Sequence, residues 1–135
     1  MTFERSTDYA LIREILTDPR AWRRMRADSE AVDFEVGPRA GLEFILARAD
    51  DGAPAAVFLI AGGVEVHFCF VTAFWGRSEP VARAFIAWCW ANTLYKRLLG
   101  PVPHHNRLAL RLAKRVGFTE YAVQGDLVLL EIRKP

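Results

Sequence analysis

Three consecutive apolar runs, joined by tight-turn signals, constrain the fold of this chain more than any other feature. LEFILARA begins at Leu42, and Asp50-Asp51-Gly52 follows it as a turn signal before AAVFLIA. Gly62-Gly63 then leads into VEVHFCFVT, residues 64–72. Joints this short connect neighbouring antiparallel strands, so the middle of the chain is predicted to be a three-stranded meander.

The third strand of this meander has two different faces, because side chains alternate along a strand. One face is apolar and carries Val64, Val66, Phe68 and Phe70. The other carries Glu65, His67 and Cys69. Glu65 and His67 are therefore expected on one surface, within reach of each other.

Helix signals precede and follow the meander. Thr7 or Asp8 is expected to cap a first helix, and Asp18-Pro19 to end it and open a second. After the loop AFWGRSEP, Ser78 is expected to cap a third helix that has Pro80 in its first turn. Both patterns predict helices packed on the faces of a sheet.

The last third of the chain adds a strand, a helix and a hairpin. YKRLLGPV reads as a strand, and Asn106 or a near neighbour caps a helix that Gly117 ends in the left-handed conformation. FTEYAV and LVLLEI flank Gln124-Gly125-Asp126 as a hairpin. The complete order predicts a mixed α/β sheet in which VEVHFCFVT and YKRLLGPV run parallel across a helical crossover.

Length and composition exclude several classes of protein. The chain has 135 residues, 52% of them hydrophobic, and reads as one globular domain over residues 1–135. Its net charge of +2 argues against a nucleic-acid partner. Cys69 and Cys89 read as buried thiols, and neither a signal peptide nor a membrane span is apparent, so we expect a cytoplasmic protein with no membrane partner.

Nearly the whole chain, and most sharply the stretch from Val64 to Glu120, resembles the GNAT acetyltransferase superfamily. The resemblance lies in a strand-Gly-Arg-helix step at Gly76-Arg77 and in Asn106-Arg-Leu-Ala109, followed by Gly117-Phe118. The compact core is also similar to small phage-encoded members. The resemblance implies the order β-α-α-β-β-β-α-β-α-β-β with the fourth and fifth strands parallel and splayed, and acetyl transfer from acetyl-CoA to a primary amine. It also allows a homodimer, because many members pair through their last strands.

The resemblance implies a binding site for CoA at the splayed strands. It assigns the CoA arm to the backbone near Phe70, Val71 and Thr72 and to Asn106, and the pyrophosphate to the N–H groups of Trp75, Gly76, Arg77 and Ser78. Gly76 would allow close approach, and a helix N-terminus favours an anion. The alternatives are an ordinary strand-to-helix turn and, for Asn106, helix capping alone.

The chain departs from the family pattern at several positions. Ala73 and Ser78 replace the outer residues of the usual pyrophosphate loop, and Glu79 brings an anion beside it. Ala113 stands where many members carry a Tyr that acts as general acid. These departures keep open a second hypothesis, a GNAT-fold binding or assembly module that has lost catalysis.

The candidates for proton transfer are Glu65, His67 and His105. An amine nucleophile must be neutral, and a carboxylate or imidazole can accept its proton directly or through water. The alternatives are a carboxylate at a solvent edge, a core histidine and a solvated loop histidine. We expect no metal, because His67 and Cys69 on a strand, with His104 and His105 in a loop, lack the spacing of a zinc site.

Two charged clusters precede Leu42, the basic one in the expected second helix. The acidic one could form a wall for a cationic acceptor or a solvated loop, and it comprises Asp28, Glu30, Asp33 and Glu35. The basic one, which supports only a weak nucleic-acid alternative, comprises Arg20, Arg23, Arg24 and Arg26.

Overall fold

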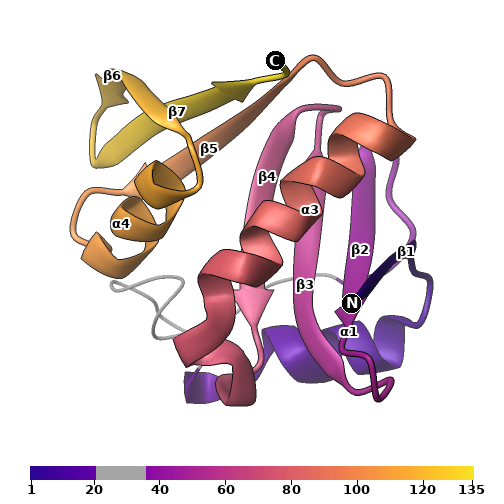
Figure 1. Cartoon of the computed structure of the whole chain (residues 1–135). Coiled ribbons are helices and arrows are strands. Elements are labelled where there is room, and N and C mark those ends of the chain that lie inside the picture. Colours follow the sequence, from indigo (N-terminus) through magenta and orange to yellow (C-terminus); the bar gives the residue numbers. More distant parts are fainter. Residues whose placement is uncertain (21–35) are drawn as a thin grey trace.

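A seven-stranded mixed sheet organises the chain, with its strands in the order β1-β2-β3-β4-β5-β7-β6 (Figure 1). The computed structural model describes residues 1–20 and 36–135. The strands are β1 (Thr2–Arg5), β2 (Leu42–Arg48), β3 (Pro54–Ala61), β4 (Glu65–Phe70), β5 (Arg97–Pro103), β6 (Thr119–Gln124) and β7 (Leu127–Arg133). The helices are α1 (Tyr9–Leu16), the 3₁₀ helix η1 (Thr72–Arg77), α3 (Ser78–Asn92) and α4 (Arg107–Arg115).

The predicted meander is confirmed. β2, β3 and β4 pair antiparallel, and β1 adds to the free edge of β2. Gly52 and Gly62 adopt φ of +86° and +58° at the two joints, a conformation that glycine reaches without strain. The glycines in the turns and the alternation of side chains along the strands therefore specify the same antiparallel pairing in this half of the sheet.

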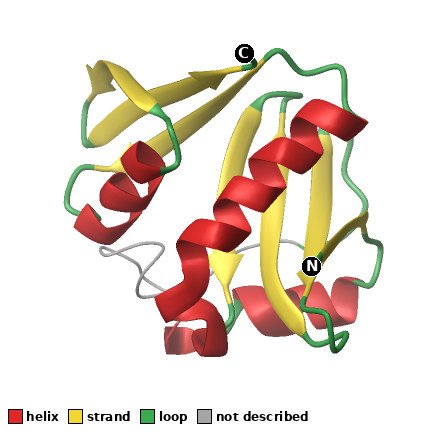
Figure 2. Ribbon diagram, viewed as in Figure 1, coloured by secondary structure: helices red, strands yellow, loops and turns green. Residues whose placement is uncertain are grey.

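Helices cover both faces of the meander (Figure 2). Alternate residues of β2 and β3 point to opposite sides, so Ile45 and Phe58 pack with α3 while Leu46 and Val57 pack with α1. The ring of Phe85 on α3 stacks on Phe58 with centroids 3.9 Å apart. Burial on both faces explains why these strands read as nearly continuous apolar runs.

The second half of the sheet has β7 between β5 and β6, an order that the sequence analysis did not predict. α4 packs on this half through Ala113, against Val102, Val128 and Leu130. Asn106 caps the helix as predicted, since its Oδ1 accepts a hydrogen bond from the Ala109 amide at 3.2 Å. At the other end Gly117 has φ +109°, which confirms the predicted left-handed ending.

The predicted caps of the N-terminal helices are present where the structure describes them. Asp8 accepts from the Leu11 amide at the start of α1. Asp18 accepts from the Arg20 amide at 2.9 Å, as expected for the cap of a helix that opens at Pro19. The predicted second helix beyond Arg20 and the two charged clusters, apart from Arg20, fall on residues 21–35, outside the described residues. Within the ranges described, no helix is long and apolar enough to cross a membrane.

Both cysteines are buried, and burial is the largest cause that raises the pKa of Cys69 and of Cys89 to about 12. A negative Asp18 nearby adds to the shift of Cys69. At about pH 8 roughly one thiol in ten thousand would then be the reactive thiolate.

We therefore expect iodoacetamide at about pH 8 to leave both cysteines of the folded protein unmodified over a time that suffices to alkylate both after denaturation in guanidinium. Intact-mass spectrometry of the two samples measures this. Alkylation of either thiol at equal rates in the folded and denatured samples would contradict its burial.

Candidate active site

β4 and β5 run parallel but pair at one register position only, Glu65 with Leu99. The Leu99 amide donates to the Val64 carbonyl at 2.8 Å. Beyond this point the two strands diverge (Figure 1). The expected splayed pair is therefore confirmed.

The hydrogen-bonding pattern of β5 explains why the strands part. Just beyond one end of β5, the His104 amide donates to the Asp126 carbonyl, and just before the other end the Lys96 carbonyl accepts from the Lys134 amide. Even-numbered residues along β5 therefore direct their backbone N–H and C=O groups toward β7. Odd-numbered residues therefore face β4, as Leu99 does. The next two such positions are Pro101 and Pro103, which have no N–H to donate. Beyond Leu99, β5 therefore offers no N–H donors to β4 at these two positions, and only its carbonyls could take part in a parallel ladder there.

The main-chain donors in the gap come from β4 instead. Val64 bonds to β5 and the Val71 amide bonds to Ala55 of β3 at 3.0 Å, so the alternation directs the amides of Phe68 and Phe70 toward the gap. The Val71 carbonyl accepts from the Phe74 amide at 2.9 Å. Both backbone groups of Val71 are thus occupied, which corrects its expected role in holding the CoA arm.

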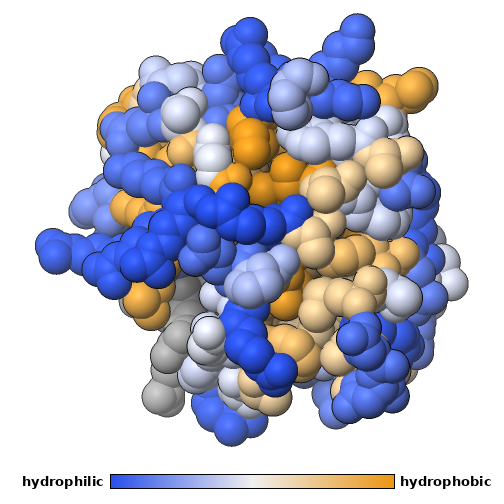
Figure 3. Space-filling model, viewed as in Figure 1, coloured by the Kyte–Doolittle hydropathy of each residue, from blue (hydrophilic) through white to orange (hydrophobic). Residues whose placement is uncertain are grey.

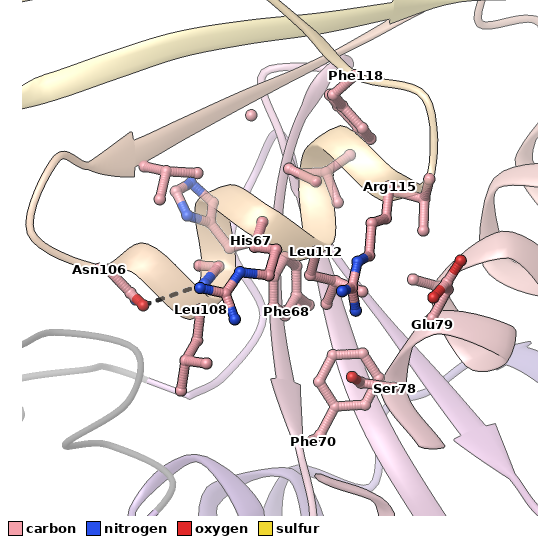
Figure 4. A pocket seen from close by; sticks show the side chains of 18 of the residues that line it. His67, Phe68, Phe70, Ser78, Glu79, Asn106, Leu108, Leu112, Arg115 and Phe118 are labelled. Carbon is pink, nitrogen blue, oxygen red and sulfur yellow. Dashed lines mark hydrogen bonds between the residues drawn. The ribbon is translucent and has the colours of Figure 1, made fainter. Parts of the chain in front are cut away.

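A cavity of about 360 Å³ fills the gap. Phe68 and Phe70 line it from the α3 side of β4, and His67 and Cys69 from the α1 side, so the cavity reaches through the sheet. Figure 4 shows His67, Phe68 and Phe70 beside α4 within this space. On the face seen in Figure 3, apolar surface (orange) lies near the centre, bordered by a hydrophilic band (blue).

The segment between β4 and α3 is a 3₁₀ helix rather than the predicted loop. The Trp75 side chain folds back and donates to the Phe70 carbonyl at 3.2 Å. Gly76 lines the cavity, and a Cβ at this position would meet no atom within 4 Å. The i→i+3 bonds of a 3₁₀ helix occupy amides that the sequence analysis expected to be open, so the donors nearest the cavity are those at the start of α3.

Two side chains of this segment differ from their expected roles. Ser78 does not cap α3: the N-cap is Arg77, without a side-chain bond, and the Ser78 hydroxyl donates to the Trp75 carbonyl at 3.4 Å. Arg77 packs over the Phe74 ring at 4.3 Å and lies against a different hollow, beside Asp50. Arg77 and Thr72 do not line the cavity, whereas Ser78 does.

Glu65 and His67 form a hydrogen-bonded pair on the α1 side of β4; His67 lines the cavity, whereas Glu65 lies outside its lining. Glu65 Oε1 lies 2.7 Å from His67 Nε2, and the two side chains are 46% and 38% exposed. A carboxylate can only accept, so this contact assigns the proton of neutral His67 to Nε2 and leaves Nδ1 with a lone pair. The pair has the arrangement of an oriented base in contact with solvent.

His105 and Asn106 lie at the turn that precedes α4. His105 is exposed, lies outside the cavity lining and stacks edge-on against His104 at 5.3 Å. Asn106 is 8% exposed and lines the cavity while it caps α4. Its capping and its place at the cavity are therefore compatible, as the sequence analysis allowed.

The sequence analysis missed Arg111 and Arg115, which line the cavity from α4. Their spacing of one helical turn was the signal that places them on one face. Ala113 is buried at the cavity wall and brings no acidic proton there. Among the residues that the structure describes, no group of His, Cys, Asp and Glu could hold a metal ion.

No family model matches the sequence, and no curated protein matches it significantly. Solved structures do match in fold. The structure of AAC(6')-Ib with paromomycin and acetyl-CoA superposes with TM-score 0.80 at 13% identity, over 98% of this chain and 93% of that one. The spermidine N-acetyltransferase SpeG F149A mutant from Vibrio cholerae gives TM-score 0.73 at 10% identity, over 98% and 95%.

A domain from Methanocaldococcus jannaschii also superposes, with TM-score 0.74 at 14% identity over 98% of this chain and 97% of that one. AAC(6')-Ib and SpeG are GNAT-fold acetyltransferases. Their likeness to this chain, together with the mixed sheet and the parallel β4–β5 pair, establishes that the chain has the GNAT fold.

Proposed function

We propose that this protein is an acetyl-CoA-dependent N-acetyltransferase that transfers the acetyl group directly from the thioester to a primary amine. The observation that carries the proposal is the cavity between β4 and β5, which His67 lines while its Nε2 is hydrogen-bonded to Glu65. The GNAT fold and the complexes of AAC(6')-Ib with CoA and acetyl-CoA support acetyl-CoA as the co-substrate.

The gap between β4 and β5 suits the amide-bearing arm of CoA. The Phe68 and Phe70 amides on β4 can donate to carbonyl groups of the arm, and the Pro101 carbonyl on β5 can accept from its N–H groups. Because Pro101 and Pro103 bring no donor, the two walls are complementary rather than alike. The apolar rings of Phe68 and Phe70 then pack along the arm.

In the proposed reaction the amine nitrogen attacks the thioester carbonyl, while His67 Nδ1 accepts its proton directly or through one water. Glu65 orients the ring and stabilises the imidazolium. A β4 amide stabilises the oxyanion of the tetrahedral intermediate. The C–S bond then breaks, and the CoA thiolate takes a proton from solvent, because Ala113 supplies none. His105 makes no contact with the cavity that supports a role in these steps.

We also predict a cytoplasmic location, a single domain over residues 1–135, a homodimer and a likeness to phage-encoded members.

The proposed acceptor is a primary amine. AAC(6')-Ib is named an aminoglycoside acetyltransferase and SpeG a spermidine N-acetyltransferase, and the amine-bearing acceptors in these names support a cationic acceptor here.

A GNAT-fold binding module without catalysis is the second candidate. The observations that favour it are the absent acid at Ala113 and the turning of Arg77 away from the cavity. Titration calorimetry with acetyl-CoA and a thiol-release assay over a panel of primary amines separate the two. We expect binding together with amine-dependent release of CoA. Absence of both leaves the module, and binding without release for any amine contradicts the enzyme.

Gly76→Val tests the ligand approach at the 3₁₀ helix. Since no protein atom lies within 4 Å of the added Cβ, we expect a small change in Tm. Acetyl-CoA affinity should fall at least about tenfold, because the side chain occupies space that only a ligand would use. Ala73→Val is the matched control, exposed on the same helix and outside the cavity. Unchanged affinity in Gly76→Val would remove this turn from the site.

Glu65→Gln tests the part of the Glu65–His67 pair in proton transfer. The amide keeps the size of the side chain but cannot balance an imidazolium, so we expect kcat to fall about 10–100-fold while KM for acetyl-CoA stays within about twofold. Glu120→Gln, exposed on β6, is the control. A wild-type kcat for Glu65→Gln across the whole pH profile would exclude the pair from proton transfer.

A further inference from the structure

We propose that Arg111 and Arg115 of α4 bind the phosphate groups of CoA, a role that the family resemblance had assigned to the turn between β4 and α3. The inference rests on the proposed function, since it names residues that would hold the anionic part of the same co-substrate. It starts from the electrostatics of the cavity rim.

Arg111 and Arg115 face the cavity from the same side of α4. They lie one helical turn apart, and both line the cavity together with Ser78 and Glu79 at the start of α3. In Figure 4 the Arg115 side chain extends from α4 toward the space in front of Ser78 and Glu79. An anion there would meet two guanidinium groups on one side and the first amides of α3 on the other.

The charges of both arginines are unbalanced within the part of the chain that the structure describes. Neither forms an ion pair there, although other surface cations do, such as Lys114 with Glu120 at 3.9 Å and Arg48 with Glu4 at 3.1 Å. Like charges held near each other without an acidic partner favour an anionic ligand.

Glu79 does not cancel these two charges. Its carboxylate binds Arg83, one turn further along α3, through Nη2 at 3.0 Å and Nε at 3.3 Å. Arg83 also donates to the main-chain carbonyl of Arg115, which ties α3 to α4 at the rim. The anion that the sequence analysis set against phosphate binding is thus already paired.

Apolar and cationic parts of the site are separate. Phe68, Phe70 and Leu112 line the interior, whereas Arg111 and Arg115 are exposed at its edge. A molecule that fits has a neutral arm and a phosphorylated end, because guanidinium groups bind phosphate oxygens with paired, charge-assisted hydrogen bonds. Arg77 packs over Phe74 and does not line the cavity.

Calorimetry with CoA and with pantetheine, which lacks every phosphate, tests the inference on Arg111→Gln, Arg115→Gln and the double variant. We expect each single change to weaken CoA binding about tenfold and the double change about 100-fold. Pantetheine affinity should stay within twofold of wild type, which shows that the arm site remains folded. Arg107→Gln, exposed on the same helix but outside the cavity lining, should match wild type.

The outcomes separate this inference from the proposed function. If wild type binds CoA and the double variant binds it within twofold, the phosphates are held elsewhere and the inference fails while the function stands. If wild type binds neither CoA nor acetyl-CoA, both fail. If pantetheine affinity falls in parallel with CoA affinity, the arginines support α4 rather than the phosphates, and the inference is overturned.

Discussion

The site depends on where the hydrogen bonds between β4 and β5 stop. One register pair joins the strands at Glu65 and Leu99, and the next two positions of β5 that face β4 are prolines. A proline cannot donate, yet it is tolerated here because the alternate residues of β5 make the complete ladder with β7. The loss of two donors coincides with the opening of the sheet in its interior, and the cavity and the access to His67 lie in this opening.

At the opening, the two faces of β4 carry different kinds of side chain. Along β4 the even-numbered residues face α3 and α4 with aromatic rings, whereas Glu65 and His67 face the side of α1. A thioester arm that enters from the α4 side would bring its carbonyl close to a base that belongs to the other side.

Much of the site could be predicted from patterns that are local in sequence. The alternation in VEVHFCFVT paired Glu65 with His67, and the short polar Asn106 before an amphipathic run predicted the cap of α4. The errors arose where local chemistry admits more than one conformation. Gly76 suggested an open loop, but the segment forms a 3₁₀ helix that turns Arg77 away, and Val71 satisfies its backbone with β3 and η1. Arg111 and Arg115 were overlooked because an exposed arginine on a helix reads as a solvated face until the opposite wall of the cavity is known.

The sequence by itself determined the order of the elements, the pairing of the meander and the caps of α1 and α4, because turns, alternation and capping depend on residues a few positions apart. Only the tertiary structure decided that β7 lies between β5 and β6, which edge of β5 the prolines occupy and which charges meet at the cavity rim. These features depend on contacts between residues far apart in the chain, such as the strand pairing of Pro101 with Leu129 and the hydrogen bond from Arg83 to the Arg115 carbonyl. Their geometry is fixed by hydrogen bonding and packing across the whole sheet, and no local pattern encodes it.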